Sequence, residues 1–424
     1  MKRHPRLAFW SHVREFAVPA SMIETATSRR RAGDWSGACA AARVDVDLHL
    51  RALHRSRGRE LVDLVRADLR ALAPDLLRWH FPRIRPDGLL RPGLTVSLAR
   101  YRLPGDEVHL VARTPPAWAD AGQRISLALW ERSGPLSGAR PDQRFRLDLH
   151  RHLWDVRRVS ELRDRCGADQ VPADGRATHR WEAEAALLLR EDGHPGTEVA
   201  VRLGARHRVV VDLHAPGSTV KSRRANGIPV LPDAATWVLP DLELWRAGVM
   251  DAERLHPLVR SALLPDHPAA APRSPGTAGT PRLVDCRGST HRIGVVGGVL
   301  VPLDHDPAEI RREELLAALG GTSLPCVTAI DAAHRNPADL DAIRARLDHG
   351  DFAGALAVVE DLLGPDAPLL DGALREELET AAERKVAHGL YRAELHELPP
   401  LPSSKDLRVP RGRGRWLHAA LRRP

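Results

Sequence analysis

The chain has 424 residues, of which 43% are hydrophobic and 28% are charged, and its formal net charge is +8. This length allows two or three domains, each with a core of its own. The composition is that of an ordinary globular protein, which argues against wholesale disorder, a collagen helix or a coiled-coil rod.

The positive charge is concentrated at the two ends of the chain. Residues 405–424 carry seven basic side chains against Asp406, a balance of +6, and residues 1–6 add +3. Residues 7–404 therefore carry −1. A neutral body argues against a broad nucleic-acid-binding face and directs attention to the tail. Only four of the 63 basic residues are lysines, an arginine bias typical of GC-rich bacterial genomes.

The four cysteines are scattered and form no C-x-x-C pair. In a chain of this length they predict reduced thiols in a cytoplasmic protein, not a disulfide framework. The apolar stretch at residues 7–10 is too short for a signal peptide. No run approaches the roughly 18 apolar residues of a membrane span, so no membrane partner is expected.

The first two regions differ in their hydrophobic pattern. Residues 1–92 are predicted to be helical, with apolar residues at helical spacing in 21–31, 36–44 and 58–72 and a short helix after Pro74. Residues 93–264 form a strand-rich α+β region. Its first three predicted strands, 95–101, 107–113 and 124–130, are expected to pair antiparallel. Residues 198–203 and 206–213 are predicted to form a hairpin about Gly204-Ala205, and a helix is predicted over 240–264.

Residues 144–150 alternate strictly between apolar and polar side chains. The pattern predicts a strand with Phe145, Leu147 and Leu149 facing inward. Arg146, Asp148 and His150 would then face water.

Residues 265–281 hold five prolines among small residues, and this composition predicts an extended linker. Beyond it, residues 282–398 are predicted to form a β-hairpin about Gly297-Gly298, followed by helices over 307–319, 337–347, 353–363 and 372–390. Residues 399–424 form a Pro-rich and basic tail. The fold class predicted for the whole chain is α+β: a helical N-terminal region, a central strand-rich region and a C-terminal hairpin with helices.

A Gly-Asp-aromatic step occurs at residues 33–35 and again at 350–352, each time before an Ala-rich stretch. Glycine can end one helix in a left-handed conformation while the aspartate caps the next. The step resembles the turn inside helical hairpins of the tetratricopeptide type. The resemblance covers about nine residues twice, without a 34-residue period, so it implies two αα-hairpins but no repeat array. Distant duplication and convergent turn chemistry both explain it.

Common catalytic signatures, such as H-E-x-x-H, G-x-S-x-G and G-x-G-x-x-G, are absent from the sequence. Residues 215–222 approach a phosphate-binding loop but lack its glycines and open no helix. The basic side chains that could hold an anion there are Lys221, Arg223 and Arg224. The alternative is a solvated basic loop.

Two groups of residues could ligate a metal ion. Asp212 and His214 are two residues apart near the end of a predicted strand, so they share one face. Cys286, His291, His305 and Cys326 form the second group, since the Gly-Gly hairpin brings His291 near residues 304–306. Their donor atoms suit zinc, although the spacings match no standard zinc module. Exposed polar residues and ordinary packing are the respective alternatives.

The preferred function is a non-catalytic interaction or adaptor protein whose basic tail engages another, acidic protein, with nucleic acid as a second partner for the tail. Arginines alternate with glycine there and end on an aromatic residue. The tail residues expected to contact the partner are Lys405, Arg408, Arg411, Arg413, Arg415 and Trp416. No cofactor is required for this function. The rival function is a metal-assisted hydrolase, with zinc held at Asp212 and His214 or at the Cys286, His291 and His305 neighbourhood.

Overall fold

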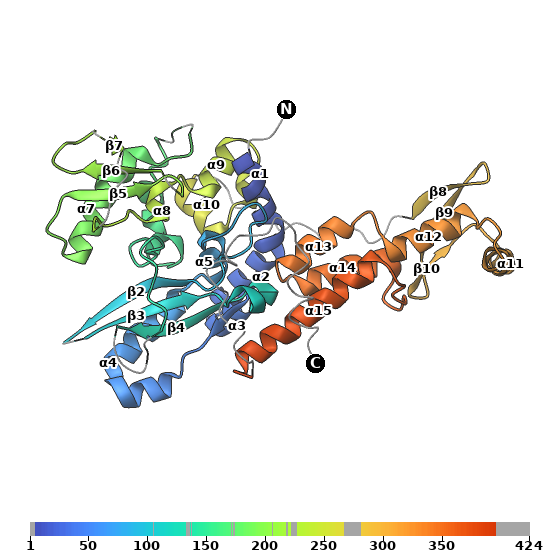
Figure 1. Ribbon diagram of the computed structural model, residues 1–424, viewed down its shortest axis with the longest axis horizontal. Helices are drawn as coiled ribbons and strands as arrows, with labels where there is room; N and C mark the ends of the chain where they lie inside the picture. The colour runs from blue at the N-terminus through green and yellow to red at the C-terminus, as the bar shows by residue number, and fades with distance from the viewer. Residues whose placement is uncertain are drawn as a thin grey trace, which may run out of the picture. The chain divides into compact units, whose positions relative to one another are not determined.

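The computed structural model describes residues 5–266 and 281–395, apart from 105, 133–135, 137, 171, 173, 206, 218 and 222–226. The side chains of 219–221, 314 and 317 are also left out. The chain forms two compact units (Figure 1). Unit 1 comprises Met1–Pro115 and Gln123–Gly276, and unit 2 comprises Pro116–Gly122 and Thr277–Pro424. Helices open the chain and sheets follow in the middle and after residue 281, so the predicted α+β class is confirmed.

Unit 1 begins with helices, as the sequence predicts. They are α1 (Pro5–His12), α2 (Ala20–Arg31), α3 (Trp35–Ala41), α4 (Leu50–Ala71) and α5 (Pro74–His80), with a π-helical turn at Val13–Ala17. Gly58 breaks the regular path of α4 with a φ of 83°. Beyond it, Leu61, Val65 and Leu69 are buried on one side of the helix, as their spacing requires. Pro74 occupies the first turn of α5. Backbone N–H groups in a first turn have no partner within the helix, so proline costs no hydrogen bond there.

The first sheet of unit 1 has the strand order β1-β4-β3-β2. Its strands are β1 (Val44–Val46), β2 (Thr95–Leu103), β3 (Asp106–Arg113) and β4 (Ile125–Glu131). The three longer strands pair antiparallel, as predicted. Strand β1 pairs in parallel with β4 and replaces the end of the helix expected over 36–44. Three residues are too few for a periodic pattern, so β1 depends on its partner strand.

The second sheet of unit 1 packs against a helix. Strands β5 (Glu198–Arg202), β6 (Arg208–Asp212) and β7 (Thr219–Lys221) pair antiparallel, which confirms the predicted hairpin. Helix α7 (Trp181–Asp192) lies beside this sheet in Figure 1, and its buried residues share one core with the valines of β5 and β6. The remaining helices of unit 1 are α6 (Leu162–Cys166), α8 (Asp233–Thr236), α9 (Pro240–Arg246) and α10 (Pro257–Leu263). The long helix predicted over 240–264 is thus divided, with Gly248 at a φ of 64° between α9 and α10.

The strand predicted over residues 144–150 does not form; the segment is a series of turns with one isolated bridge at Arg146. Phe145, Leu147 and Leu149 are buried as predicted, but Arg146 and His150 are buried too. Both polar side chains find charged partners inside unit 1, which offsets the cost of removing them from water. Alternation alone could not show this.

Unit 2 contains a three-stranded antiparallel sheet of order β10-β9-β8, with β8 (Arg282–Cys286), β9 (Ser289–Val296) and β10 (Val299–Pro302). Gly297 and Gly298 join β9 to β10 with φ values of 59° and 82°, so the predicted Gly-Gly hairpin is confirmed. The helices are α11 (Pro307–Ala318), α12 (Pro325–Arg335), α13 (Leu340–Asp348), α14 (Phe352–Leu363) and α15 (Ala373–Arg392). Helix α12 was not predicted, although it packs on all three strands.

The connection between β3 and β4 belongs to unit 2. Asp120 pairs with Arg384 of α15 at 3.3 Å, and the carbonyl of Ala119 accepts a 2.8 Å hydrogen bond from His388. Trp118 packs edge-on against Tyr391 of the same helix. Unit 2 is therefore built from two separate stretches of chain, which the sequence did not indicate.

Both Gly-Asp-aromatic steps form the predicted helix-to-helix turns. Gly33 and Gly350 each have a φ of 78°. The carboxylate of Asp34 accepts a hydrogen bond from the Gly37 amide at 2.8 Å, and that of Asp351 accepts one from the Gly354 amide at 3.3 Å. The α2–α3 hairpin of unit 1 and the α13–α14 hairpin of unit 2 thus use the same capping chemistry. The predicted borders at residues 92, 264 and 398 stay predictions.

We expect Asp34→Ala to lower the free energy of unfolding by about 1 kcal/mol, because an amide at the start of α3 loses its acceptor. Asp34→Asn retains a side-chain oxygen at the cap and should stay close to the wild type. Urea denaturation followed by circular dichroism measures both. Equal destabilisation by alanine and asparagine would show that the exposed Arg29 ion pair, not the cap, matters.

Candidate functional site

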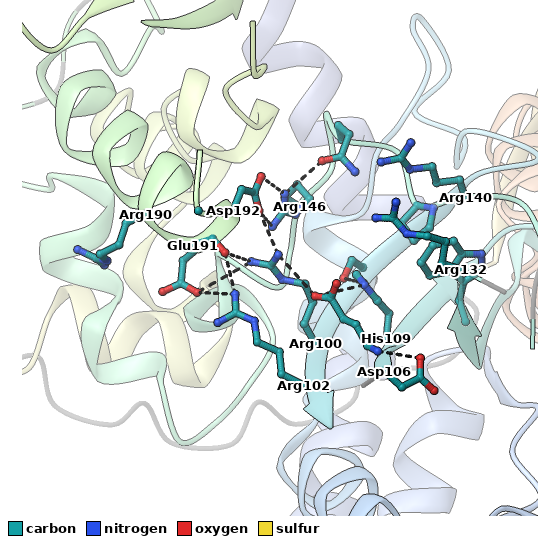
Figure 2. A pocket seen from close by; sticks show the side chains of 16 residues that line it. Arg100, Arg102, Asp106, His109, Arg132, Arg140, Arg146, Arg190, Glu191 and Asp192 are labelled. Atoms are coloured by element: carbon teal, nitrogen blue, oxygen red, sulfur yellow. Dashed lines mark hydrogen bonds and ion pairs between the residues drawn. The ribbon is translucent and has the colours of Figure 1, made fainter. Parts of the chain in front are cut away.

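A pocket of about 950 Å³ lies in unit 1 between β2 and β3, the 140–146 turns and the end of α7 (Figure 2). Six arginines line it against four carboxylates. The arginines are Arg100, Arg102, Arg132, Arg140, Arg146 and Arg190. The carboxylates belong to Asp106, Glu107, Glu191 and Asp192.

The innermost arginine of this pocket is Arg146, whose side chain is only 2% exposed. It donates to Asp148 at 2.9 Å and to Asp192 at 3.0 and 3.1 Å. Arg100 lies beside it and contacts the same two carboxylates, each at 3.0 Å. Figure 2 shows its contact with Asp192. Burial by itself would lower the pKa of Arg146, but its hydrogen bonds to Asp148 and Asp192 raise it. Two arginines and two aspartates thus form a fixed, charged floor.

Ser97 and His109 form a second polar pair at this pocket. The Ser97 hydroxyl lies 2.9 Å from His109 Nδ1, and the Glu107 carboxylate lies 3.8 Å from His109 Nε2. Burial lowers the pKa of His109, and the charge of Glu107 opposes this shift only in part, so the imidazole is neutral near pH 7. Ser97 is 1% exposed on β2, so the pair orders the pocket wall instead of presenting a nucleophile to a substrate.

The rim arginines differ from those of the floor. Arg132, Arg140 and Arg190 are exposed, and no described residue forms a hydrogen bond or ion pair with their guanidinium groups. No dashed line reaches any of the three in Figure 2, where Arg132 and Arg140 are drawn across the pocket from Arg190. Guanidinium groups bind carboxylates and phosphates through paired hydrogen bonds. The pocket can therefore receive an anionic group while its floor stays in place.

Helix α7 is held at the pocket by a second charged cluster. The Glu184 carboxylate lies 3.1 Å from His150 Nε2 and 3.0 Å from both Arg165 and Arg180. Burial would raise the pKa of Glu184, but the hydrogen bonds from His150 and Arg165 hold it well below its ordinary value. This cluster fixes the helix whose end supplies Arg190 and Asp192.

Asp212 and His214 belong to no group of three or more metal-ligating side chains among the described residues. The Asp212 carboxylate accepts from the Thr197 hydroxyl and from the backbone amide of His214, both at 3.0 Å. The His214 imidazole is exposed and makes no hydrogen bond to that carboxylate. The hydrogen bonds from the His214 amide and from Thr197 lower the pKa of Asp212. These contacts are those of a strand-ending turn.

The second predicted group does come together. One donor atom from each of Cys286, His291, His305 and Cys326 lies within 4.8 Å of the others. Both cysteines are buried, while the two histidines are partly exposed. Helix α12 supplies Cys326 from its first turn, which explains why the sequence alone could not place this residue with the rest.

The other predicted contact residues lie outside the described part of the chain. They are the side chain of Lys221, Arg223 and Arg224, and the tail residues Lys405, Arg408, Arg411, Arg413, Arg415 and Trp416. Their assignment stays a prediction.

The arginine-lined pocket was not predicted. Its residues come from β2, β3, β4, the 140–146 turns and α7, so no local pattern contains them. Two short signals existed, since Arg146 is followed by Asp148 and Arg190 by Asp192. Basic and acidic residues two apart on turns or helix ends are common on surfaces, so these pairs do not by themselves indicate a pocket.

No protein-family model, curated protein or solved structure matches the chain. Among the described residues, none of the helices combines the length and apolar character that a membrane span requires.

We expect Arg146→Met to destabilise unit 1 by about 3 kcal/mol or more, because Asp148 and Asp192 lose their buried counter-charge. Arg132→Met, at the exposed rim of the same pocket, should change the free energy of unfolding by less than about 0.5 kcal/mol. Urea denaturation measures both variants. Similar small losses would show that the floor is not a stabilising element.

The pH dependence provides the matching control. Burial would raise the pKa of Asp192, but Arg146 and Arg100 hold it below its ordinary value. A carboxylate with a lowered folded-state pKa stabilises the protein fully above its unfolded value of about 3.9, and this contribution is lost as the pH falls through the lower folded value. Wild-type stability should therefore fall more steeply below about pH 4 than that of Arg146→Met. Parallel curves would contradict the assignment.

Proposed function

We propose that this protein is a non-catalytic binding or adaptor protein that engages an acidic segment of another protein. The arginine-lined pocket of unit 1 is the proposed contact site, and the basic tail is a second one. An extended peptide rich in aspartate and glutamate offers carboxylates that can pair with the exposed arginines of the pocket rim.

One observation carries this proposal: exposed arginines without a described partner stand above a floor where the arginines are already paired. Arg146 and Arg100 are neutralised by Asp148 and Asp192, so they keep the pocket in shape without competing for the ligand. Arg132, Arg140 and Arg190 keep their donors available. A preorganised site loses less conformational entropy on binding than one that must assemble.

The hydrolase alternative has weaker support. The Asp212 carboxylate accepts hydrogen bonds from the Thr197 hydroxyl and the His214 backbone amide, contacts typical of a strand-ending turn. The Cys286 cluster offers four protein donors, which would fill a tetrahedral shell and leave no position for a reactive water. Among the residues that the structure describes, neither neighbourhood has the three-ligand, open arrangement of a catalytic zinc site.

The test is binding of a fluorescent peptide of glutamates and aspartates to the full chain, measured by anisotropy. We expect Arg132→Gln/Arg140→Gln to weaken binding about tenfold, because two exposed charge contacts together contribute about 1–2 kcal/mol. Arg51→Gln/Arg55→Gln removes the same charge from exposed positions of α4 and should bind like the wild type. Added salt should weaken the wild type more than the pocket variant.

Equal affinities of the two double variants would remove the pocket from the proposal. Tighter binding of single-stranded DNA of the same length and charge would replace the protein partner with a nucleic acid.

The tail is tested in the same assay by deleting residues 405–424. We expect weaker binding and a flatter salt dependence, because the deletion removes a balance of +6. A chain with Arg411, Arg413 and Arg415 changed to glutamine keeps the tail length and should show part of the same effect. Unchanged binding at low salt would exclude a role for the tail.

A further inference from the structure

We propose that unit 2 holds one structural zinc ion in a tetrahedral site formed by Cys286, His291, His305 and Cys326. The ion would join the three-stranded sheet to helix α12. This inference is independent of the acidic-segment proposal, since none of the four residues belongs to the arginine-lined pocket or to the basic tail.

The donor atoms already approach the spacing of a tetrahedral site. Bond lengths of about 2.3 Å to sulfur and 2.0–2.1 Å to nitrogen place a sulfur and a nitrogen about 3.5 Å apart, and two nitrogens about 3.3 Å apart. Cys286 Sγ lies 3.6 Å from His305 Nε2. His291 Nδ1 lies 2.7 Å from His305 Nε2, so these two nitrogens need to separate by only about 0.6 Å. The imidazole planes stand at 80°, so both rings direct a nitrogen to one point without stacking.

Four separate elements deliver these side chains. Cys286 ends β8, His291 lies on β9, His305 follows β10 and Cys326 lies in the first turn of α12. The residues next to the two histidines are themselves tied together, because the Arg292 amide donates to Asp304 at 2.7 Å and its guanidinium pairs with the same carboxylate at 2.7 Å. The hairpin thus sets the histidine pair before any metal is bound.

His305 also has the outer partner that zinc-binding histidines use. Its Nδ1 lies 3.3 Å from a carboxylate oxygen of Glu309, one turn further along the chain in α11. Such a hydrogen bond fixes which ring nitrogen carries the proton and leaves Nε2 free for the metal. The Nε2 atom is the one that faces Cys286 and His291.

The burial of apolar side chains alone provides little stability to the three-stranded sheet of unit 2. Of the 17 residues in β8, β9 and β10, only Cys286, Ile293 and Leu300 are buried. Leu283 is 70% exposed and Val296 is 55% exposed. Three buried side chains supply little hydrophobic free energy for a sheet. A structural zinc ion supplies folding free energy directly in such small modules.

The chemistry of the donors selects zinc and a closed site. Two thiolates and two imidazoles in a tetrahedron are a typical zinc set. Each thiol loses its proton to solvent, and the sulfur electron pair forms the bond to the metal. Two thiolate charges then balance Zn²⁺, so the buried group is neutral. With all four positions filled by protein, the ion is structural.

Elemental analysis of the full chain, purified without chelators or an affinity metal, is the first test. We expect one zinc per chain. After removal of the zinc, added Co²⁺ should give the intense thiolate-to-metal absorption and the visible bands of tetrahedral cobalt. Less than a tenth of an equivalent of zinc, together with no thiolate bands after Co²⁺ is added to reduced protein, would overturn the proposal.

Cysteine variants locate the ion. Cys286→Ser and Cys326→Ser should each lose the stoichiometric zinc, whereas Cys39→Ser and Cys166→Ser, which alter the buried free cysteines of unit 1, should keep it. Zinc retained by both unit 2 variants would place the metal elsewhere and contradict the site.

Two further variants keep the test valid if a serine variant fails to fold. His291→Cys retains four donors and should still bind one zinc, with stronger thiolate-to-cobalt absorption. Glu309→Ala leaves all four ligands and should weaken zinc affinity about 10- to 100-fold, measured by competition with a chromophoric chelator. An unchanged zinc affinity in Glu309→Ala, with His291→Cys unable to bind, would contradict the geometry described above.

Discussion

The interior of unit 1 depends on buried guanidinium groups whose charge is met by carboxylates and carbonyl oxygens. Arg78 is completely buried and donates to the carbonyls of Ala17 and Gln123. Arg146 meets Asp192 of α7 across 46 residues of sequence, and Arg180 meets Glu184 one turn away. Removing such groups from water is costly, and only well-placed partners offset that cost. A different arrangement of turns and helices would separate the partners and leave an unpaired charge in the interior of unit 1. The pairs therefore favour the observed arrangement.

This dependence limits what the sequence could predict. Strands β2 to β6, the Gly-Gly hairpin and both Gly-Asp turns follow from short-range rules, and all of them are present. Arg146 and His150 were expected in water because alternation assigns every second residue to the outside. Their burial is decided by Asp192 and Glu184, which lie 34 or more residues away. The pocket floor could not be predicted for the same reason.

The Cys286, His291, His305 and Cys326 group was likewise only partly predictable from the sequence. The hairpin made it predictable that His291 and His305 would meet, since they flank two paired strands. Cys326 reaches them only because α12, which starts with Pro325, packs on the three strands, a long-range contact that no local pattern encodes. Unit 1 thus arranges buried arginines around carboxylates, while unit 2 gathers sulfur and imidazole beside a sparsely buried sheet. The two units thus supplement apolar packing with different polar groups.

The segment 116–122 belongs to unit 2 although it connects two strands of unit 1. Its glycine, Gly122, lies so close to Gly350 that a Cβ at Gly350 would stand 2.3 Å from the Gly122 carbonyl oxygen, whereas Gly33 in the matching turn has nothing within 4 Å. The α13–α14 turn is therefore fitted to a strand connection that the ribosome makes more than 200 residues earlier. A backbone cut within residues 267–280 would not remove the contacts of α15 with residues 118–120 of the N-terminal fragment. The two fragments would therefore remain associated as a noncovalent complex. A fragment expressed from residue 277 onward would lack residues 116–122, which are part of unit 2.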